Sequence, residues 1–309
     1  MKNEHPWNDY SSYIRKKFRV RVQKIAVDAG FTCPNRDGSI GTGACIYCNN
    51  QSFSPYYCNS NNSITEQLNK GITFFSNKYK TQKYLAYFQT YTNTYAPIET
   101  CIEKYTEALN VNEVTGLVIA TRPDCISENM LKEIKKLVGN KYLCIEYGME
   151  STLNSTLKKI NRGHTIEQTI EAIQLTNQLG ITTGVHLILG LPGESKNEML
   201  KHTDILNDLP VDILKLHQMQ IIKGTPAADL FERNPADFEN FALNDYIKFV
   251  SLFIRQIKPQ IIIERFTSET PPETLIAPKW GGVKNFEVVH KIRAYMLEHN
   301  YSQSDLFTA

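Results

Sequence analysis

Apolar runs alternate along the chain with segments that have the spacing of amphipathic helices. After residue 20, seven runs dense in Ile, Val, Leu and Tyr predict β-strands. They cover residues 21–27, 83–92, 115–124, 141–150, 183–193, 212–222 and 260–266. Such runs, separated by helical segments, are typical of parallel strands covered by helices. Their spacing of roughly 30 residues fits repeated strand–helix–strand units.

The segments between these strands carry helix signals. Residues 165–180 begin at a threonine N-cap, Thr165, and stop at Gly180, which predicts one complete helix. Residues 63–79 and 127–139 have the same helical pattern. The chain is therefore predicted to be an α/β protein.

Polar residues gather where the predicted strands end. The clusters are residues 89–92, 121–124, 146–151, 190–194 and 217–220. In parallel α/β architectures the carboxyl ends of the strands carry the functional site. A doubly wound sheet also fits the alternation, but polar residues at nearly every strand end favour a barrel, closed or partial.

No linker rich in Gly and Pro divides the chain, so we expect one catalytic domain with additions at both ends. The predicted parts are an N-terminal arm in residues 1–20, a core barrel in residues 21–225 and a C-terminal extension in residues 226–309. The extension is expected to pack on the barrel and close it. Its segment 264–282 has the composition of a loop that closes over the mouth.

Composition and charge exclude several classes of protein. The 309 residues are 41% hydrophobic and 21% charged, which is ordinary for a globular protein. A net charge of +2 implies no broad field for nucleic acid or membrane. The N-terminus is polar, and no apolar run approaches the roughly 20 residues that cross a bilayer. We expect a cytoplasmic protein with no membrane partner.

The basic stretch at residues 13–24, "YIRKKFRVRVQK", has two interpretations. It is the solvated face of an alternating strand, or it attracts phosphate on RNA or on a small molecule. Because the overall charge is nearly balanced and no RNA-binding module is evident, we favour a small substrate.

Three of the seven cysteines lie in one glycine-rich loop that follows the first predicted strand. Eleven residues separate Cys33 from Cys45, and two separate Cys45 from Cys48. Thiolates grouped in this way bind zinc or an iron–sulfur cluster. A structural zinc takes four ligands, with Cys58 or a histidine as the fourth, whereas a catalytic cluster held by three cysteines leaves one iron open. A loop at the mouth of a barrel favours the cluster, and we assign Cys58 no role.

The chain resembles the radical S-adenosylmethionine (SAM) superfamily, in the branch related to the elongator catalytic subunit and of the YhcC/YtqA type. The similarity lies in "GFTCPNRDGSIGTGACIYCN", "YLAYFQTYTNTYA", "ATRPDC", "INRGH", "HLILGLPGE" and "KLHQMQIIKGTP", which together span most of residues 15–285. The cysteine spacing departs from the commonest superfamily pattern, C-x3-C-x2-C. We expect no counterpart of the acetyltransferase domain of the elongator subunit.

This resemblance implies a partial (β/α)6 barrel of TIM type that holds a [4Fe–4S] cluster on Cys33, Cys45 and Cys48. SAM chelates the open iron, and one electron cleaves it to methionine and a 5′-deoxyadenosyl radical, which abstracts hydrogen from a substrate. An electron donor such as flavodoxin or ferredoxin is implied. The three cysteines are thus the expected catalytic and metal residues.

The resemblance and the strand-end positions also suggest binding residues. The expected SAM-binding residues are Gln89, Thr90, Thr92, Glu150, Ser151, Arg162, Gly190 and Met219. The expected substrate-binding residues are Tyr91, Arg122, Asp124, Lys215, His217, Lys223, Glu264 and Arg265. His186 is as well explained by a core position as by a catalytic role.

Three functions stay open. The first is a lyase acting on a small nucleoside or nucleotide; one activity in this branch is queuine lyase, which releases queuine from queuosine 5′-phosphate. The second is a radical SAM enzyme that modifies tRNA. The third, of a different class, is a zinc-stabilised binding module. Among these the lyase is our leading hypothesis.

Overall fold

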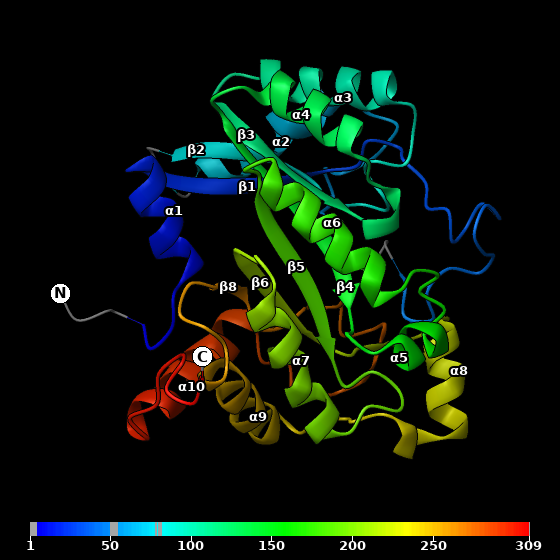
Figure 1. Ribbon diagram of the computed structural model, residues 1–309, viewed down its shortest axis with the longest axis vertical. Coiled ribbons are helices and arrows are strands. Elements are labelled where there is room, and N and C mark those ends of the chain that lie inside the picture. The colour runs from blue at the N-terminus through cyan, green and yellow to red at the C-terminus, as the bar shows by residue number, and fades with distance from the viewer. Residues whose placement is uncertain (1–4, 50–54, 78, 80–81, 309) are drawn as a thin grey trace.

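Seven parallel strands form one curled sheet in the computed structural model, which describes residues 5–49, 55–77, 79 and 82–308. The strands are β1 (Arg21–Val27), β2 (Gln82–Phe88), β3 (Val114–Thr121), β4 (Tyr142–Glu150), β5 (Thr182–Leu189), β6 (Ile213–Gln218) and β8 (Ile262–Arg265). Their order in the sheet is β1-β2-β3-β4-β5-β6-β8. A doubly wound sheet reverses direction at a switch point, and this order does not reverse. The sheet is an open half-barrel, which confirms the predicted fold class (Figure 1).

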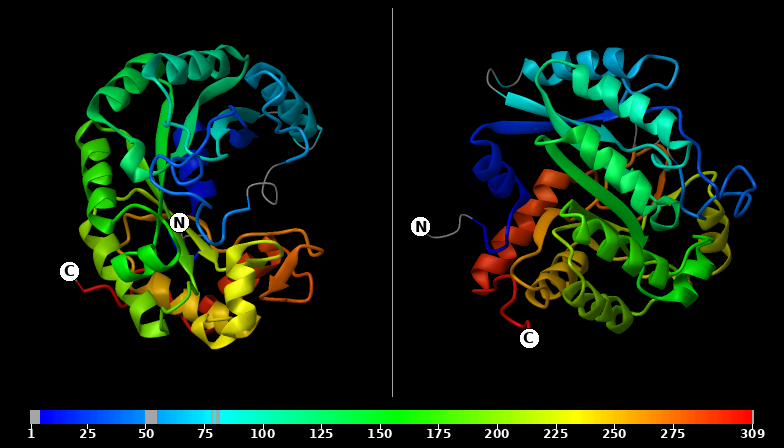
Figure 2. Two further views of the ribbon diagram at one scale, coloured as in Figure 1. Left: turned by 90° about the vertical axis from the view of Figure 1, so that its right-hand side faces the viewer. Right: turned by 45° about the horizontal axis from the view of Figure 1, so that its top comes forward.

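Helices cover the outer face of this sheet, as Figures 1 and 2 show. The helices between successive sheet strands are α2 (Ile64–Ser76), α3 (Ile98–Asn110), α4 (Glu128–Val138), α5 (Asn154–Lys159), α6 (Ile166–Gln178), α7 (Lys196–Asp208), α8 (Pro226–Arg233) and α9 (Leu243–Arg255). Helix α1 (Tyr10–Phe18) precedes the sheet and α10 (Asn285–Glu298) follows it. Short 3-10 turns lie at Pro123–Cys125 and Pro235–Asp237.

Helix α6 shows how the local sequence sets an element. Thr165 is its N-cap, and it forms a capping box in which its side chain accepts from the Gln168 backbone while Gln168 bonds back to the cap. The predicted start is confirmed. Its last helical residue is Gln178, and Gly180 follows in the left-handed region at φ 65°. The predicted end is therefore accurate to within two residues.

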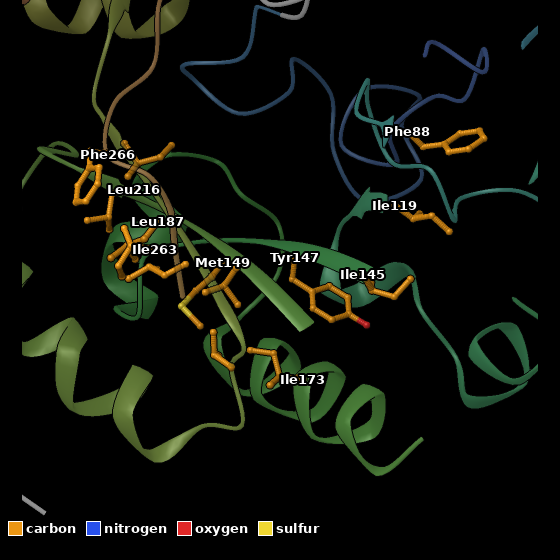
Figure 3. Packing of buried hydrophobic residues seen from close by; sticks show 14 of the residues in the cluster. Phe88, Ile119, Ile145, Tyr147, Met149, Ile173, Leu187, Leu216, Ile263 and Phe266 are labelled. Carbon is orange, nitrogen blue, oxygen red and sulfur yellow. The ribbon is translucent and has the colours of Figure 1, made fainter. Parts of the chain in front are cut away.

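Side chains alternate across each strand and so divide the core from the site. On β4, Tyr147 and Met149 point toward the α6 helix that carries Ile173 (Figure 3). The intervening residues, Glu146 among them, point into the half-barrel. Each strand therefore contributes one row of side chains to the apolar layer under the helices and one row to the interior.

Helix α1 closes the amino end of the half-barrel. Its buried Ile14 packs in one apolar cluster with Tyr142 and Ile213, which lie at the starts of β4 and β6. The helix contacts β1 and β8, the two edge strands. The predicted N-terminal arm thus contains a helix that seals the interior opposite the carboxyl ends of the strands.

The interpretation of the basic stretch as a solvated face fails at Lys24. This β1 residue turns inward, where its Nζ lies 2.8 Å from Glu146 Oε1 and 2.6 Å from Glu264 Oε1. The second pair joins the edge strands β1 and β8. The alternation of side chains within β1 could not predict these ion pairs of Lys24, because the partners lie 122 and 240 residues away in the sequence.

The C-terminal part of the chain completes the sheet and flanks the site. Strand β8 adds the seventh strand beside β6, and α9 packs against α10. A small antiparallel pair, β7 (Ile221–Ile222) with β9 (Leu275–Ala277), ties the segment after β8 to the end of β6. Within the described ranges, no helix is long and apolar enough to span a bilayer.

Candidate functional site

A cavity of about 250 Å³ opens at the carboxyl ends of the strands. The thiol groups of Cys33, Cys45 and Cys48 all contribute to its lining. Polar residues from the ends of β2 to β6 and of β8 form the remaining wall. The structure therefore brings the three predicted cysteines together at the expected edge of the sheet.

The cysteine loop is anchored by the segment that follows α5. Asn161 donates from Nδ2 to the Ala44 carbonyl at 2.6 Å, and Asn35 Nδ2 donates to the Asn161 carbonyl at 2.5 Å. The Ile46 amide donates to the Ile160 carbonyl at 3.1 Å. These contacts hold the loop against the "INRGH" motif, which explains how two distant motifs build one site.

Three polar side chains donate hydrogen bonds to the cysteine sulfurs. Arg36 Nη2 lies 3.2 Å from Cys48 Sγ, and Arg162 Nη1 lies 3.6 Å from Cys45 Sγ. Asn35 Nδ2 lies 3.7 Å from Cys45 Sγ. Burial raises the pKa of Cys48, and the adjacent Arg36 opposes that rise. Guanidinium donors beside sulfur favour the thiolate form that iron and zinc bind.

Arg162 occupies a central place in the wall. Its Nη2 donates to the Gly148 carbonyl at 2.8 Å and lies 3.5 Å from Glu150 Oε1. Burial raises the pKa of Glu150, and Arg162 counteracts it. Among the described residues, the buried Nε of Arg162 has no hydrogen-bond partner. An orphaned guanidinium N–H beside the thiols suits an acceptor atom of a bound ligand.

The residues present fit a cubane cluster with SAM. Within the described ranges, no three His, Cys, Asp or Glu side chains converge on a single metal ion. A [4Fe–4S] cluster held by three cysteines takes one thiolate on each of three irons, so its ligands need to face one cavity and not one point. The three cysteines in one cavity wall meet that requirement, and the two guanidinium groups of Arg36 and Arg162 lie beside them.

Most of the expected binding residues lie in the cavity wall. Of the expected SAM contacts, the wall includes Gln89, Thr92, Glu150, Arg162 and Met219. Of the expected substrate contacts, it includes Tyr91, Arg122, His217 and Arg265.

Three expected SAM contacts lie outside the wall. The fully buried Ser151 donates its hydroxyl to Glu194 Oε1 at 2.5 Å. Gly190, at φ 93°, approaches the backbone carbonyl of Glu239, which would lie 2.7 Å from an added Cβ. In the structure the close backbone approach at Gly190 is to this carbonyl. Thr90 is buried behind the wall.

Four expected substrate contacts are also engaged elsewhere. Lys215 and Glu264 belong to the charged network below the cavity floor, described next. Asp124 holds the Arg122 guanidinium through two bonds of 2.9 and 2.7 Å. Lys223 is exposed and donates to a backbone carbonyl just before β9.

Charged side chains form a network below the cavity. The fully buried carboxylate of Glu146 lies 2.7 Å from Lys215 Nζ, which also donates to the Tyr87 hydroxyl at 2.9 Å. Lys24 bridges Glu146 and Glu264. Burial would by itself raise the pKa of Glu146, but Lys215 and Lys24 outweigh it and hold that pKa well below its usual range. The carboxyl group of Glu146 is therefore ionised in the folded protein.

Sequence reasoning missed several wall residues. They are Arg36, Tyr47, Tyr87 and Ser268; Glu146 and Gln218 fall in the predicted strand-end clusters but were given no role, and His186 was left open. The alternation of side chains along a strand could have identified two of these residues, because residues two or four positions apart share a face. Tyr87 is two residues before Gln89, and Glu146 is four residues before Glu150. Arg36 and Ser268 lie on loops, where no periodicity applies.

Comparison with known proteins places the chain in a family. The Radical SAM superfamily profile matches residues 33–206, and the Radical_SAM C-terminal domain profile matches residues 211–298. The uncharacterized protein YtqA of Bacillus subtilis is 32% identical over 304 residues, which cover 98% of this chain and 94% of YtqA. A tRNA uridine(34) acetyltransferase of Methanocaldococcus infernus is 29% identical over 198 residues, 62% of this chain and 35% of that protein.

One solved structure supports the fold. The archaeal Methanocaldococcus infernus Elp3 with an N-terminal deletion superposes with a TM-score of 0.69 at 20% identity, over 91% of this chain and 64% of that one. Since the superfamily profile covers more than half of the chain and YtqA matches along nearly its whole length, this protein is a member of the radical SAM superfamily, whose enzymes use a [4Fe–4S] cluster and SAM.

Proposed function

We propose that Cys33, Cys45 and Cys48 hold the [4Fe–4S] cluster and that SAM occupies the cavity beside them. The observation that carries this proposal is the single cavity wall shared by three thiols and two guanidinium donors. When bound, the cluster and SAM supply a radical that removes a hydrogen atom from a substrate.

The chain's own residues then have defined tasks. Arg36 and Arg162 offset the negative charge of the thiolates. The free Nε of Arg162 suits the carboxylate of SAM, and Glu150 suits the ribose hydroxyls as an acceptor. The wall positions of Gln89 and Thr92 suit the amino group of SAM.

For the substrate, we propose a small nucleotide, with queuosine 5′-phosphate as the specific candidate and release of queuine as the reaction. Arg265 lines the cavity, and among the described residues no carboxylate pairs with it, so it suits a phosphate. Arg122 is held by Asp124 and fits that task less well. Asp124, Glu264 and Glu146 are all bound in ion pairs, so none of these three carboxylates is free to accept from a guanine-like edge.

A tRNA substrate is the second candidate. It is favoured by the similarity to a protein named tRNA uridine(34) acetyltransferase, of which this chain matches 35%. The basic residues of α1 lie at the amino end of the half-barrel, opposite the cavity. That position separates them from a tRNA bound at the cavity mouth, so we favour the nucleotide.

The test is an anaerobic assay of the reconstituted protein with SAM, a reductant and queuosine 5′-phosphate. Mass spectrometry would follow 5′-deoxyadenosine and free queuine. Formation of both supports the lyase. Formation of 5′-deoxyadenosine alone rejects this substrate and makes tRNA the next candidate. Binding of tRNA should weaken steeply as the salt concentration rises.

A further inference from the structure

A hydrogen-bonded row of four side chains crosses the cavity wall. Ser268, in the segment after β8, bonds through its Oγ to His217 Nδ1. His217 Nε2 lies 3.2 Å from His186 Nδ1. His186 Nε2 lies 3.0 Å from Glu146 Oε2. The four residues come from four separate elements, and all of them line the cavity.

Glu146 fixes the direction of this row. Its two oxygens already accept from Lys24 and Lys215 at 2.8 and 2.7 Å, which keep it ionised. An ionised carboxylate only accepts hydrogen bonds. The hydrogen between His186 and Glu146 therefore sits on His186 Nε2.

The remaining hydrogens follow by elimination. His186 faces Glu146 on β4, Lys215 and His217 on β6, and Arg265 on β8. Burial and the positive charge of Lys215 lower the pKa of His186 to about 4, so the ring is neutral at pH 7. A neutral ring with hydrogen on Nε2 accepts at Nδ1.

His217 is subject to the same argument. Because His186 Nδ1 accepts, His217 Nε2 donates to it. Burial and the neighbouring His186 lower the pKa of His217 well below its usual value, so this ring is also neutral. His217 Nδ1 therefore accepts, and the hydroxyl of Ser268 donates to it. Every hydrogen in the row points from Ser268 toward Glu146.

We propose that Ser268, His217 and His186 are a proton relay that takes a proton from a substrate hydroxyl or protonated amine in the cavity and returns it later in the reaction. The relay rests on the proposed function, because it needs a substrate in this cavity. It adds that the reaction includes a proton transfer, which hydrogen-atom abstraction by itself does not require.

The steps balance in protons and move no electrons between centres. The substrate gives a proton to Ser268 Oγ as the serine proton passes to His217 Nδ1. The Nε2 proton of His217 passes to His186 Nδ1, so His186 becomes an imidazolium ion beside Glu146. The reverse sequence delivers the proton back. Because Lys24 and Lys215 keep Glu146 ionised, the proton stops at His186.

Two further features suit a relay. The imidazole rings of His186 and His217 lie nearly parallel, at 14° with centroids 5.2 Å apart. Gln218 holds Ser268 on both sides, accepting from its amide at 2.8 Å and donating to its carbonyl at 2.9 Å. The backbone that carries the hydroxyl is thereby fixed beside His217.

The first test needs no substrate. Nitrogen-15 NMR of histidine-labelled, reconstituted protein at pH 7 reports the charge and tautomer of each ring, and the variants His186→Gln and His217→Gln assign the signals. We expect both rings to be neutral with hydrogen on Nε2. An imidazolium ion or an Nδ1–H tautomer at either position would overturn the relay.

The second test uses turnover of queuosine 5′-phosphate. Ser268→Ala should lower queuine formation by about 10²- to 10⁴-fold, while SAM is still cleaved to 5′-deoxyadenosine and the KM of the substrate changes little. Ser268→Thr keeps a hydroxyl and should restore turnover to within about tenfold of wild type. Equal product yield in Ser268→Ala and wild type would reject the relay.

The two tests separate the relay from the proposed function. If wild-type protein does not turn over queuosine 5′-phosphate, the proposed substrate is wrong, and the NMR spectra still decide whether the relay exists. If turnover occurs but the histidine tautomers differ from those expected, the relay is wrong and the lyase stands.

Discussion

At the scale of single residues, Arg162 connects the cysteine loop to the end of β4. One guanidinium group donates to Cys45 Sγ and to the Gly148 carbonyl and lies beside Glu150. Its planar fork serves these partners at once, which the point charge of a lysine cannot do. Its remaining N–H is available to a ligand.

Arg162→Lys should therefore weaken SAM binding to the reconstituted protein. Loss of one charge-assisted hydrogen bond corresponds to about a tenfold rise in Kd. Equilibrium dialysis under anaerobic conditions measures it. Arg233→Lys, on the surface of α8, is the matched control and should bind as wild type does. Unchanged affinity in Arg162→Lys would remove this residue from the SAM site.

The cysteines give a second prediction at this scale. Alanine at Cys33, Cys45 or Cys48 should abolish retention of the cluster, measured as iron and sulfide per chain. Cys58→Ala should keep full iron content, because Cys58 lies outside the cavity wall and burial raises its pKa to about 12. Loss of iron in Cys58→Ala would show that our ligand assignment is wrong.

At the scale of elements, the end of β5 depends on Gly190. Its φ is 93°, and an added Cβ would meet the Glu239 carbonyl at 2.7 Å. Gly224 has a similar φ of 74°, with no atom within 4 Å of its added Cβ. Comparing alanine substitutions at the two glycines therefore separates the cost of backbone strain from the cost of steric overlap.

Gly190→Ala should cost more stability than Gly224→Ala. Both variants bear the strain of a left-handed conformation, on the order of 1 kcal/mol. Gly190→Ala must also displace backbone, so we expect a further loss of about 1–3 kcal/mol. Urea unfolding of both variants measures the difference. Equal free energies of unfolding would contradict the close approach.

The elements also show what sequence can and cannot predict. The seven strands were predictable because apolar runs and period-two alternation are local properties. The place of the three cysteines in the cavity wall was predictable because their loop directly follows β1, at the edge of the sheet where the carboxyl ends of the strands meet. The contacts of Lys24, and the placement of Ser268 beside His217, depend on how the sheet curls and on residues tens to hundreds of positions apart. Local patterns carry no information on such pairs.

At the scale of the whole molecule, the buried charges couple folding to pH. His186 has its pKa lowered from 6.5 to about 4 by burial and Lys215. Between these values the unfolded chain binds a proton at this position and the folded protein does not. Stability is therefore lost as pH falls from 6.5 toward 4. The lowered pKa of Glu146 also makes the free energy of unfolding decrease as pH falls, in the pH range below the usual pKa of a carboxyl group.

His186→Gln should flatten this dependence. The free energy of unfolding of wild type should fall faster with acidification than that of the variant, by up to about 1.4 kcal/mol per pH unit. Urea titrations of cluster-free protein from pH 7.5 to 4.5 measure both, so that acid lability of a cluster does not enter. Parallel curves would show that His186 does not contribute.

The central claim is that the three-cysteine cavity performs radical SAM chemistry. The most direct test is to incubate anaerobically reconstituted protein with SAM and dithionite and to measure 5′-deoxyadenosine and methionine by mass spectrometry. We predict that both form in equal amounts in wild type and in Cys58→Ala, and that neither forms when Cys33, Cys45 or Cys48 is alanine. A protein that carries its full iron–sulfur content and yields neither compound would contradict the account.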